Sequence, residues 1–154
     1  MKRVTALLLL TLVALAAAGC SGSAAASATA DTAGGQLTIK DVWARAAVAG
    51  ADTAVYFTIV NGRSAADTLT GVTADVAQSA GLHQTTTDTS GMTGMQMLPT
   101  VPIPGGGTVA FAPGGYHVML TSLKKALNAG DSVQLTLTFQ NAGTVNVTAE
   151  VRAN

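Results

Sequence analysis

The segment from Val133 to Val151 constrains the fold most strongly, because apolar and polar side chains alternate along it. Every second residue is apolar between Val133 and Phe139, and again between Val145 and Val151. This alternation is typical of strands that bury one face, and the intervening segment 141–143 (Asn-Ala-Gly) predicts a hairpin turn. The sequence therefore predicts a β-hairpin whose apolar face packs against other strands.

Earlier segments have the same character, with short apolar runs separated by Gly, Pro and Asn. Eight or nine short strands and no long helix indicate an all-β protein, either a β-sandwich or a barrel. About 119 residues are enough for a single hydrophobic core. The additional strands are predicted at residues 37–39, 42–44, 55–59, 69–74, 76–83, 108–112 and 116–120, with one helical turn at 123–127.

The first twenty residues predict export. Lys2 and Arg3 precede an apolar run, residues 4–18, that is too short for a membrane-spanning helix. Small residues then precede Cys20, the only cysteine, which is typical of a lipoprotein signal with Cys20 lipidated. Cleavage as an ordinary secretory signal at a later alanine is the alternative. We expect a lipid-anchored protein at the outer face of the cytoplasmic membrane, or a periplasmic one.

Three parts are predicted: a lipoprotein signal peptide at 1–19, a flexible linker at 20–35 and a β-sandwich domain at 36–154. The linker consists of Ala, Ser, Thr and Gly with one Asp, and it has too little apolar surface to order itself. Without Lys2 and Arg3, six of the eight basic residues remain against eight acidic ones, a net charge of −2. This charge argues against nucleic acid or an anionic membrane surface as a partner.

One stretch, residues 83–119, contains both histidines, His83 and His117. Imidazole and thioether groups bind metals, and soft sulfur selects monovalent copper. The stretch also holds every methionine after Met1: Met92, Met95, Met97 and Met119.

In the predicted strand at 116–120, His117 and Met119 alternate with apolar residues. Val118 and Leu120 are its natural core residues, so His117 and Met119 are expected to face solvent or a second layer. Segment 92–97 is rich in Gly and Met and has no core periodicity. It is predicted to be a loop that folds over this strand.

Each of these residue types also has an ordinary explanation. A lone histidine is usually a polar surface or turn residue, and a lone methionine usually fills a gap in the core. For His83, Met92 and Met97 taken singly, both interpretations stay open. The joint pattern favours a copper(I) site, because all these residues fall in one window and two share a strand face. Whether Met92 or Met97 joins the site stays open.

The spacing of four of these residues resembles a known motif. Ten residues lie between Gln84 and Met95, twenty-one between Met95 and His117, and one between His117 and Met119. This resembles the signature H-(M)-x10-M-x21-H-x-M of the PCuAC family of periplasmic copper chaperones. Gln84 stands where many members have an additional methionine. Segments 43–45 (Trp-Ala-Arg) and 113–117 (Pro-Gly-Gly-Tyr-His) are also similar to family positions.

The resemblance implies a cupredoxin-like Greek-key β-sandwich that binds one Cu(I) through His83, Met95, His117 and Met119. Family members are associated with delivering copper to the copper centre of cytochrome oxidase, alone or with Sco-type thiol proteins. The expected function is therefore that of an extracytoplasmic copper(I) chaperone. Its recipient is expected to be a copper protein such as a cytochrome oxidase subunit or a Sco-type protein.

Two other functions stay open. One is a non-catalytic interaction module whose exposed methionine surface binds a protein partner, and the other is copper buffering without delivery. An enzyme is not expected, because both histidines belong to the predicted site and the carboxylates are scattered. Blue-copper electron transfer needs a thiolate, and none remains after Cys20.

Overall fold

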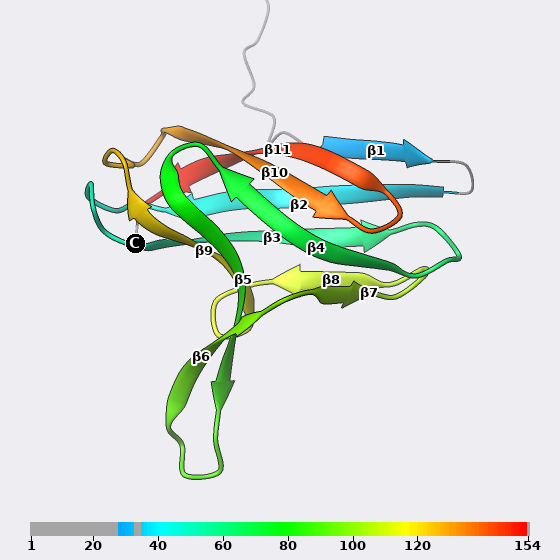
Figure 1. Ribbon diagram of the computed structural model, residues 1–154, viewed down its shortest axis with the longest axis horizontal. Helices are drawn as coiled ribbons and strands as arrows, with labels where there is room; N and C mark the ends of the chain where they lie inside the picture. The colour runs from blue at the N-terminus through cyan, green and yellow to red at the C-terminus, as the bar shows by residue number, and fades with distance from the viewer. Residues whose placement is uncertain (1–27, 33–34, 154) are drawn as a thin grey trace, which may run out of the picture.

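The strands of this protein join edge to edge into one curved sheet (Figure 1). The computed structural model describes residues 28–32 and 35–153, and these ranges contain no helix. They form eleven strands: β1 (Ala28–Thr32), β2 (Gly35–Arg45), β3 (Thr53–Asn61), β4 (Asp67–Ala74), β5 (Ala77–Thr87), β6 (Thr93–Leu98), β7 (Val101–Ile103), β8 (Thr108–Phe111), β9 (Tyr116–Leu123), β10 (Ser132–Phe139) and β11 (Gly143–Arg152).

The strand order is β6-β5-β9-β8-β3-β2-β11-β10-β4-β7, with β1 beside β2. Among the described pairs, β11–β2 and β8–β9 are parallel and the others are antiparallel. Two short connections, residues 75–76 and 99–100, carry the chain from one arm of this path to the other. The arms therefore enclose one core, and the expected all-β sandwich is confirmed.

The alternating apolar residues supply that core. Leu82 and Val118 come from one arm, while Leu135 and Val147 come from the other, and all four are at most 3% exposed. The predicted hairpin is confirmed, because β10 and β11 pair from Ser132 to Phe139 around a turn at residues 140–142. Burial of one strand face thus fixes which side chains point outward.

The helical turn expected at 123–127 is wrong. β9 runs to Leu123, and the chain then continues without helix to Leu127. Leu127 bonds across to Ala47 in both directions, with N···O distances of 2.8 and 3.0 Å. Its backbone groups are satisfied by another segment and not by the carbonyl four residues earlier.

Three segments for which no strand is expected form strands, which raises the number above the eight or nine expected, although the expected strands at 37–39 and 42–44 join into one, β2. One of the three, Val101–Ile103, pairs with β4 as β7. Ala28–Thr32 lie within the expected linker, yet they pair with β2 as β1. Thr93–Leu98 lie within the expected methionine loop, yet they pair with β5 as β6. Backbone pairing at an open strand edge requires no apolar side chains, so composition alone does not predict it. Cys20 and the predicted signal at 1–19 lie outside the described residues.

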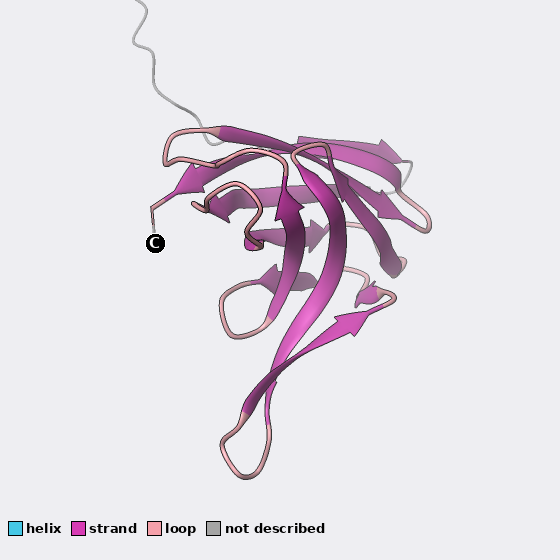
Figure 2. Ribbon diagram, turned by 60° about the vertical axis from the view of Figure 1, so that its left-hand side comes forward, coloured by secondary structure: helices cyan, strands magenta, loops and turns pink. Residues whose placement is uncertain are grey.

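The hairpin of β5 and β6 extends beyond the body of the sandwich (Figures 1 and 2). Its turn is held by Asp88, whose Oδ1 accepts the backbone N–H groups of Ser90 and Met92, each at 2.9 Å. The Ser90 hydroxyl also donates to this carboxylate, and these bonds lower the pKa of Asp88. The turn is therefore ordered by its own hydrogen bonds.

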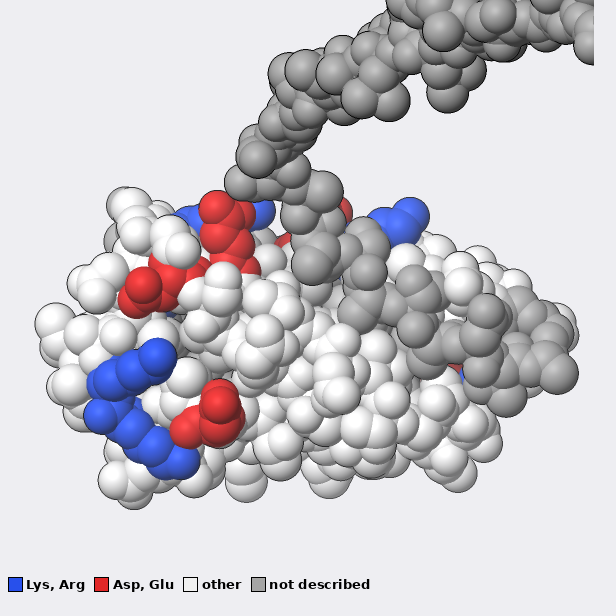
Figure 3. Space-filling model, turned by 90° about the horizontal axis from the view of Figure 1, so that it is seen from above, with Lys and Arg blue, Asp and Glu red and all other residues white. Residues whose placement is uncertain are grey.

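On the part of the face that Figure 3 leaves uncovered, charged side chains of both signs lie near one another. Lys and Arg lie close to Asp and Glu there, with a broad uncharged area between the groups. Among the described residues, no helix is long and apolar enough to cross a membrane.

Candidate metal centre

Two histidines and a methionine form one row across three adjacent strands. His83 on β5 lies directly opposite His117 on β9. On its other side, His83 lies directly opposite Met97 on β6. Directly opposite residues project from the same face of a sheet, with Cβ atoms about 4.5 to 5.5 Å apart. The register thus assembles two imidazoles and one thioether on the outward face.

The other two predicted ligands occupy the neighbouring rows. Met119 on β9 lies opposite Gly81 on β5, and Met95 on β6 lies opposite Thr85 on β5. Residues two apart on a strand share a face, so these residues project on the same side as His83. The structure therefore brings all four predicted residues to one face, but the expected loop over the β9 strand is wrong. The methionine segment lies beyond β5, at the edge of the sheet.

His117 is only 4% exposed, although it points away from the core. It is therefore not exposed to solvent as one of the two expectations had it, and the Tyr56 ring beside it belongs to a neighbouring strand of the same sheet and not to a second layer. The ring of Tyr56 lies 6.4 Å from the His117 ring, and Trp43 lies 4.6 Å from Tyr56. The rings of Trp43 on β2 and Tyr56 on β3 therefore extend the row formed by His83 and His117.

A glycine turn fixes the tautomer of His117. The turn from Ala112 to Gly115 is closed by a 3.0 Å backbone hydrogen bond, and Gly114 has a φ of 82° that favours glycine. The Gly115 carbonyl accepts the backbone N–H of Thr85 at 3.0 Å and contacts Nδ1 of His117 at 3.1 Å. Because a carbonyl only accepts, Nδ1 carries the proton and Nε2 presents its lone pair.

His83 is partly buried, and its ring centroid lies 5.8 Å from that of His117. Its pKa is lowered, first because burial disfavours the imidazolium and second because a charged His117 would repel it. Both effects favour the neutral imidazole, which is the form that binds a metal.

A cavity of about 360 Å³ borders this face on the side of β2 and β3. Met95, His117 and Met119 line it together with Tyr56 and Arg45. The Arg45 guanidinium lies 5.7 Å from the centre of the Tyr56 ring. Two predicted thioethers and one predicted imidazole thus border the same open space.

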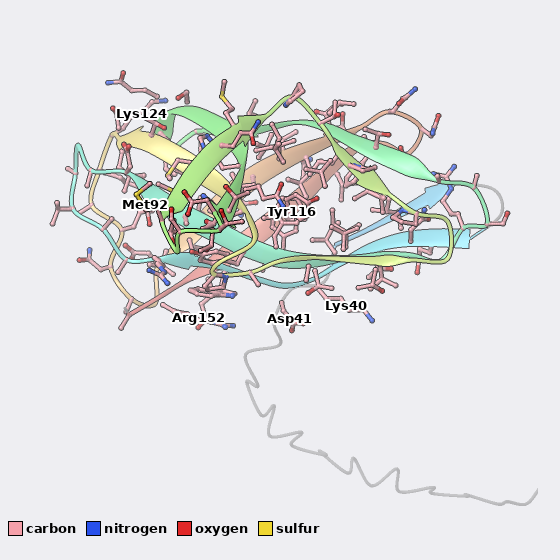
Figure 4. All side chains as sticks on the ribbon, turned by 90° about the horizontal axis from the view of Figure 1, so that it is seen from below. Lys40, Asp41, Met92, Tyr116, Lys124 and Arg152 are labelled. Atoms are coloured by element: carbon pink, nitrogen blue, oxygen red, sulfur yellow. The ribbon has the colours of Figure 1, made fainter. Side chains whose placement is uncertain are left out.

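The thioethers of the hairpin are accessible to solvent. Met95 is 63% exposed and Met97 is 70% exposed. Met92, which is 69% exposed, also lies on the hairpin, to the left of Lys40 and Asp41 in Figure 4. Methionines this exposed do not fill a core, so packing does not account for them.

The candidate ligands on this face are imidazole nitrogens and thioether sulfurs, which are softer donors than carboxylate oxygens. Within residues 28–32 and 35–153, no group of three His, Cys, Asp or Glu side chains is placed to hold a metal ion. Two imidazoles with nearby thioethers suit Cu(I) better than a hard divalent cation, which prefers carboxylate oxygens.

The sequence did not reveal three features of the site: Gly81 opposite Met119, the Gly115 carbonyl at His117, and Tyr56 beside His117. A glycine inside a predicted strand two residues before a histidine is a signal of close approach that was available for Gly81. The role of Tyr56 depends on pairing between distant strands, which no local pattern predicts.

A family profile described as "Putative lipoprotein LpqE-like" matches residues 37–151. The chain belongs to this family. "Putative lipoprotein Lxx21020" of Leifsonia xyli subsp. xyli is 35% identical over 127 residues, which are 80% of this chain and 76% of that protein. The LpqE-like chain is also similar to solved structures of PCuAC domains.

"Copper-bound PCuAC domain from PmoF2" is 29% identical with a TM-score of 0.65, over 80% of this chain and 97% of that one. The solution structure of "CuI-DR1885" from Deinococcus radiodurans is 37% identical with a TM-score of 0.58, over 75% and 79% of the two chains. These similarities confirm the expected PCuAC family and the cupredoxin-like sandwich.

The lowered pKa of His83 leads to a testable pH dependence. We expect His83 in the metal-free LpqE-like protein to titrate below the ordinary value of 6.5. Because the unfolded chain then takes up this proton at higher pH, His83 lowers the stability of the folded protein as pH falls through 6.5. Titration of the imidazole C–H signals by NMR measures the pKa directly.

The variant His117→Asn keeps an amide nitrogen near the Gly115 carbonyl and removes the second imidazole, which lowers the pKa of His83 through its charge when it is protonated. In this variant the pKa of His83 should rise towards 6.5 without reaching it, because burial remains. A wild-type pKa of His83 at or above 6.5 would contradict the described environment.

Proposed function

We propose that this LpqE-like protein is an exported copper(I) chaperone that binds one Cu(I) on the outward face of β5 and β9. His83, Met95, His117 and Met119 are the proposed ligands. The observation that carries this proposal is the direct pairing of His83 with His117, whose Nε2 is left free by the Gly115 carbonyl. Copper binding by related domains, as their names state, supports it.

The chemistry of the donors fits a carrier. Imidazole and thioether are neutral, so the bound ion keeps its single positive charge, which favours Cu(I) over Cu(II). Binding displaces few protons at neutral pH, because the pKa of His83 is already lowered. Exposed thioethers on a hairpin allow an incoming ligand to replace them one at a time.

An anaerobic Cu(I) titration against a coloured competing chelator tests the binding. The wild-type protein should take up one tight equivalent. Each of His83→Asn and Met119→Leu should weaken binding about tenfold or more, roughly 1.4 kcal/mol, because each removes one donor.

The matched control is Met92→Leu, which alters an exposed methionine outside the proposed ligand set and should bind as wild type does. Circular dichroism checks that each variant keeps its β fold. Absence of tight wild-type binding, or equal affinity in all four proteins, would rule out the proposed site.

We also propose delivery to a copper protein, such as a cytochrome oxidase subunit or a Sco-type protein, in place of buffering. Transfer from the Cu(I)-loaded protein to the metal-free copper domain of such a subunit should speed up with recipient concentration. That dependence is expected for ligand exchange within a complex. A buffer releases copper first, so its transfer rate would be independent of the recipient. Stopped-flow mixing measures the rate.

Anchoring at Cys20 through a lipid is the third part of the proposal. It is supported by the lipoprotein descriptions of the family and of the Leifsonia relative. In cells making the full chain, wild type should fractionate with membranes, and Cys20→Ser should not. Ser23→Ala is the control and should fractionate as wild type. Equal distribution of wild type and Cys20→Ser would contradict a lipid anchor.

A further inference from the structure

Met97 holds a position that the motif spacing does not assign to a ligand. It lies directly opposite His83, whereas Met95 lies opposite Thr85. Direct neighbours have Cβ atoms about 4.5 to 5.5 Å apart, but diagonal neighbours are about 7 to 8 Å apart. Of the two thioethers on β6, Met97 is therefore the nearer to the His83 imidazole.

The space above Gly81 identifies where these donors converge. A Cβ atom on Gly81 would lie 3.3 Å from Nε2 of His83 and 3.9 Å from Sδ of Met97. Both donor atoms thus already point into the space that the missing side chain leaves open. Met119 lies directly opposite Gly81 on β9, so it borders the same space from the other strand.

An ordinary packing role does not explain Met97. Its side chain is 70% exposed, so it fills no gap in the core. Its neighbour Leu98, by contrast, is partly buried and packs against the core cluster. The outward face of β6 therefore places a thioether beside an imidazole nitrogen without any gain in apolar burial.

We infer that Cu(I) binds above Gly81 and that Met97 supplies a thioether ligand there, together with His83, His117 and Met119. This inference rests on the proposed copper function and replaces one ligand of the set proposed from the motif, Met95, with Met97. Met95 lies one row farther out, opposite Thr85, and borders the cavity that His117 and Met119 also line; with Met97 in its place the four donors are complete.

Two glycine substitutions on the same hairpin test the position of the ion. Gly81→Ala places a methyl group in the proposed copper space, and Gly81 has no positive φ that would strain alanine. Cu(I) affinity in the competition titration should fall at least tenfold. Gly94→Ala on β6 is the matched control, because its Cβ would meet nothing within 4 Å. Equal affinity of both variants and wild type would overturn the position above Gly81.

Methionine methyl NMR tests the ligand itself. In the full-length protein with ¹³C-methyl methionine, one equivalent of Cu(I) should shift the Met97 and Met119 signals and leave Met92 unchanged. Met97→Leu assigns its signal and should weaken binding at least tenfold, whereas Met92→Leu should not.

The outcomes separate the two proposals. If the Met119 signal shifts with one tight equivalent of Cu(I) while the Met97 signal stays unchanged, copper binding stands and Met97 as a ligand is overturned. If wild type binds no Cu(I), the proposed function fails as well. A Met97 shift with weakened binding in Met97→Leu supports both.

Discussion

The site depends on the register of β5 between its two neighbours. Leu82 points into the core opposite Val118, and this burial fixes which faces of β5 and β9 look outward. A slip of one residue would turn His83 inward and expose Leu82. The free energy that buries the core therefore also places the imidazoles side by side. No separate device is needed to assemble the row of donors.

Polar contacts on the outward face then set the chemistry of that row. The Gly115 carbonyl connects the glycine turn to β5 and holds the proton of His117 on Nδ1. Tyr56 lies beside His117, which is 4% exposed. On the other side, the exposed β6 edge supplies thioethers. An ordered imidazole pair beside accessible sulfur suits an ion that must be held and then released.

The sequence predicts the sandwich and the donor residues because both leave local patterns. Alternation marks the strands that bury one face, and the clustering of His83 and His117 with the methionines marks the soft donors. The pairing of β6 with β5 leaves no such pattern, since all but Leu98 of its side chains are exposed and nothing apolar specifies its register. For that reason Met97 opposite His83 and the open space above Gly81 became visible only in three dimensions. The position of Tyr56 beside His117 likewise brings together residues that are distant in sequence.

X-ray absorption at the copper edge of the Cu(I)-loaded protein tests the central claim most directly. The account predicts a four-coordinate Cu(I) ion with two nitrogen scatterers at imidazole distance and two sulfur scatterers. Replacing Met119 by Leu should remove one sulfur scatterer and leave the imidazole signature intact. A copper ion surrounded by nitrogen and oxygen alone, with no sulfur in its first shell, would contradict the proposed thioether–imidazole site.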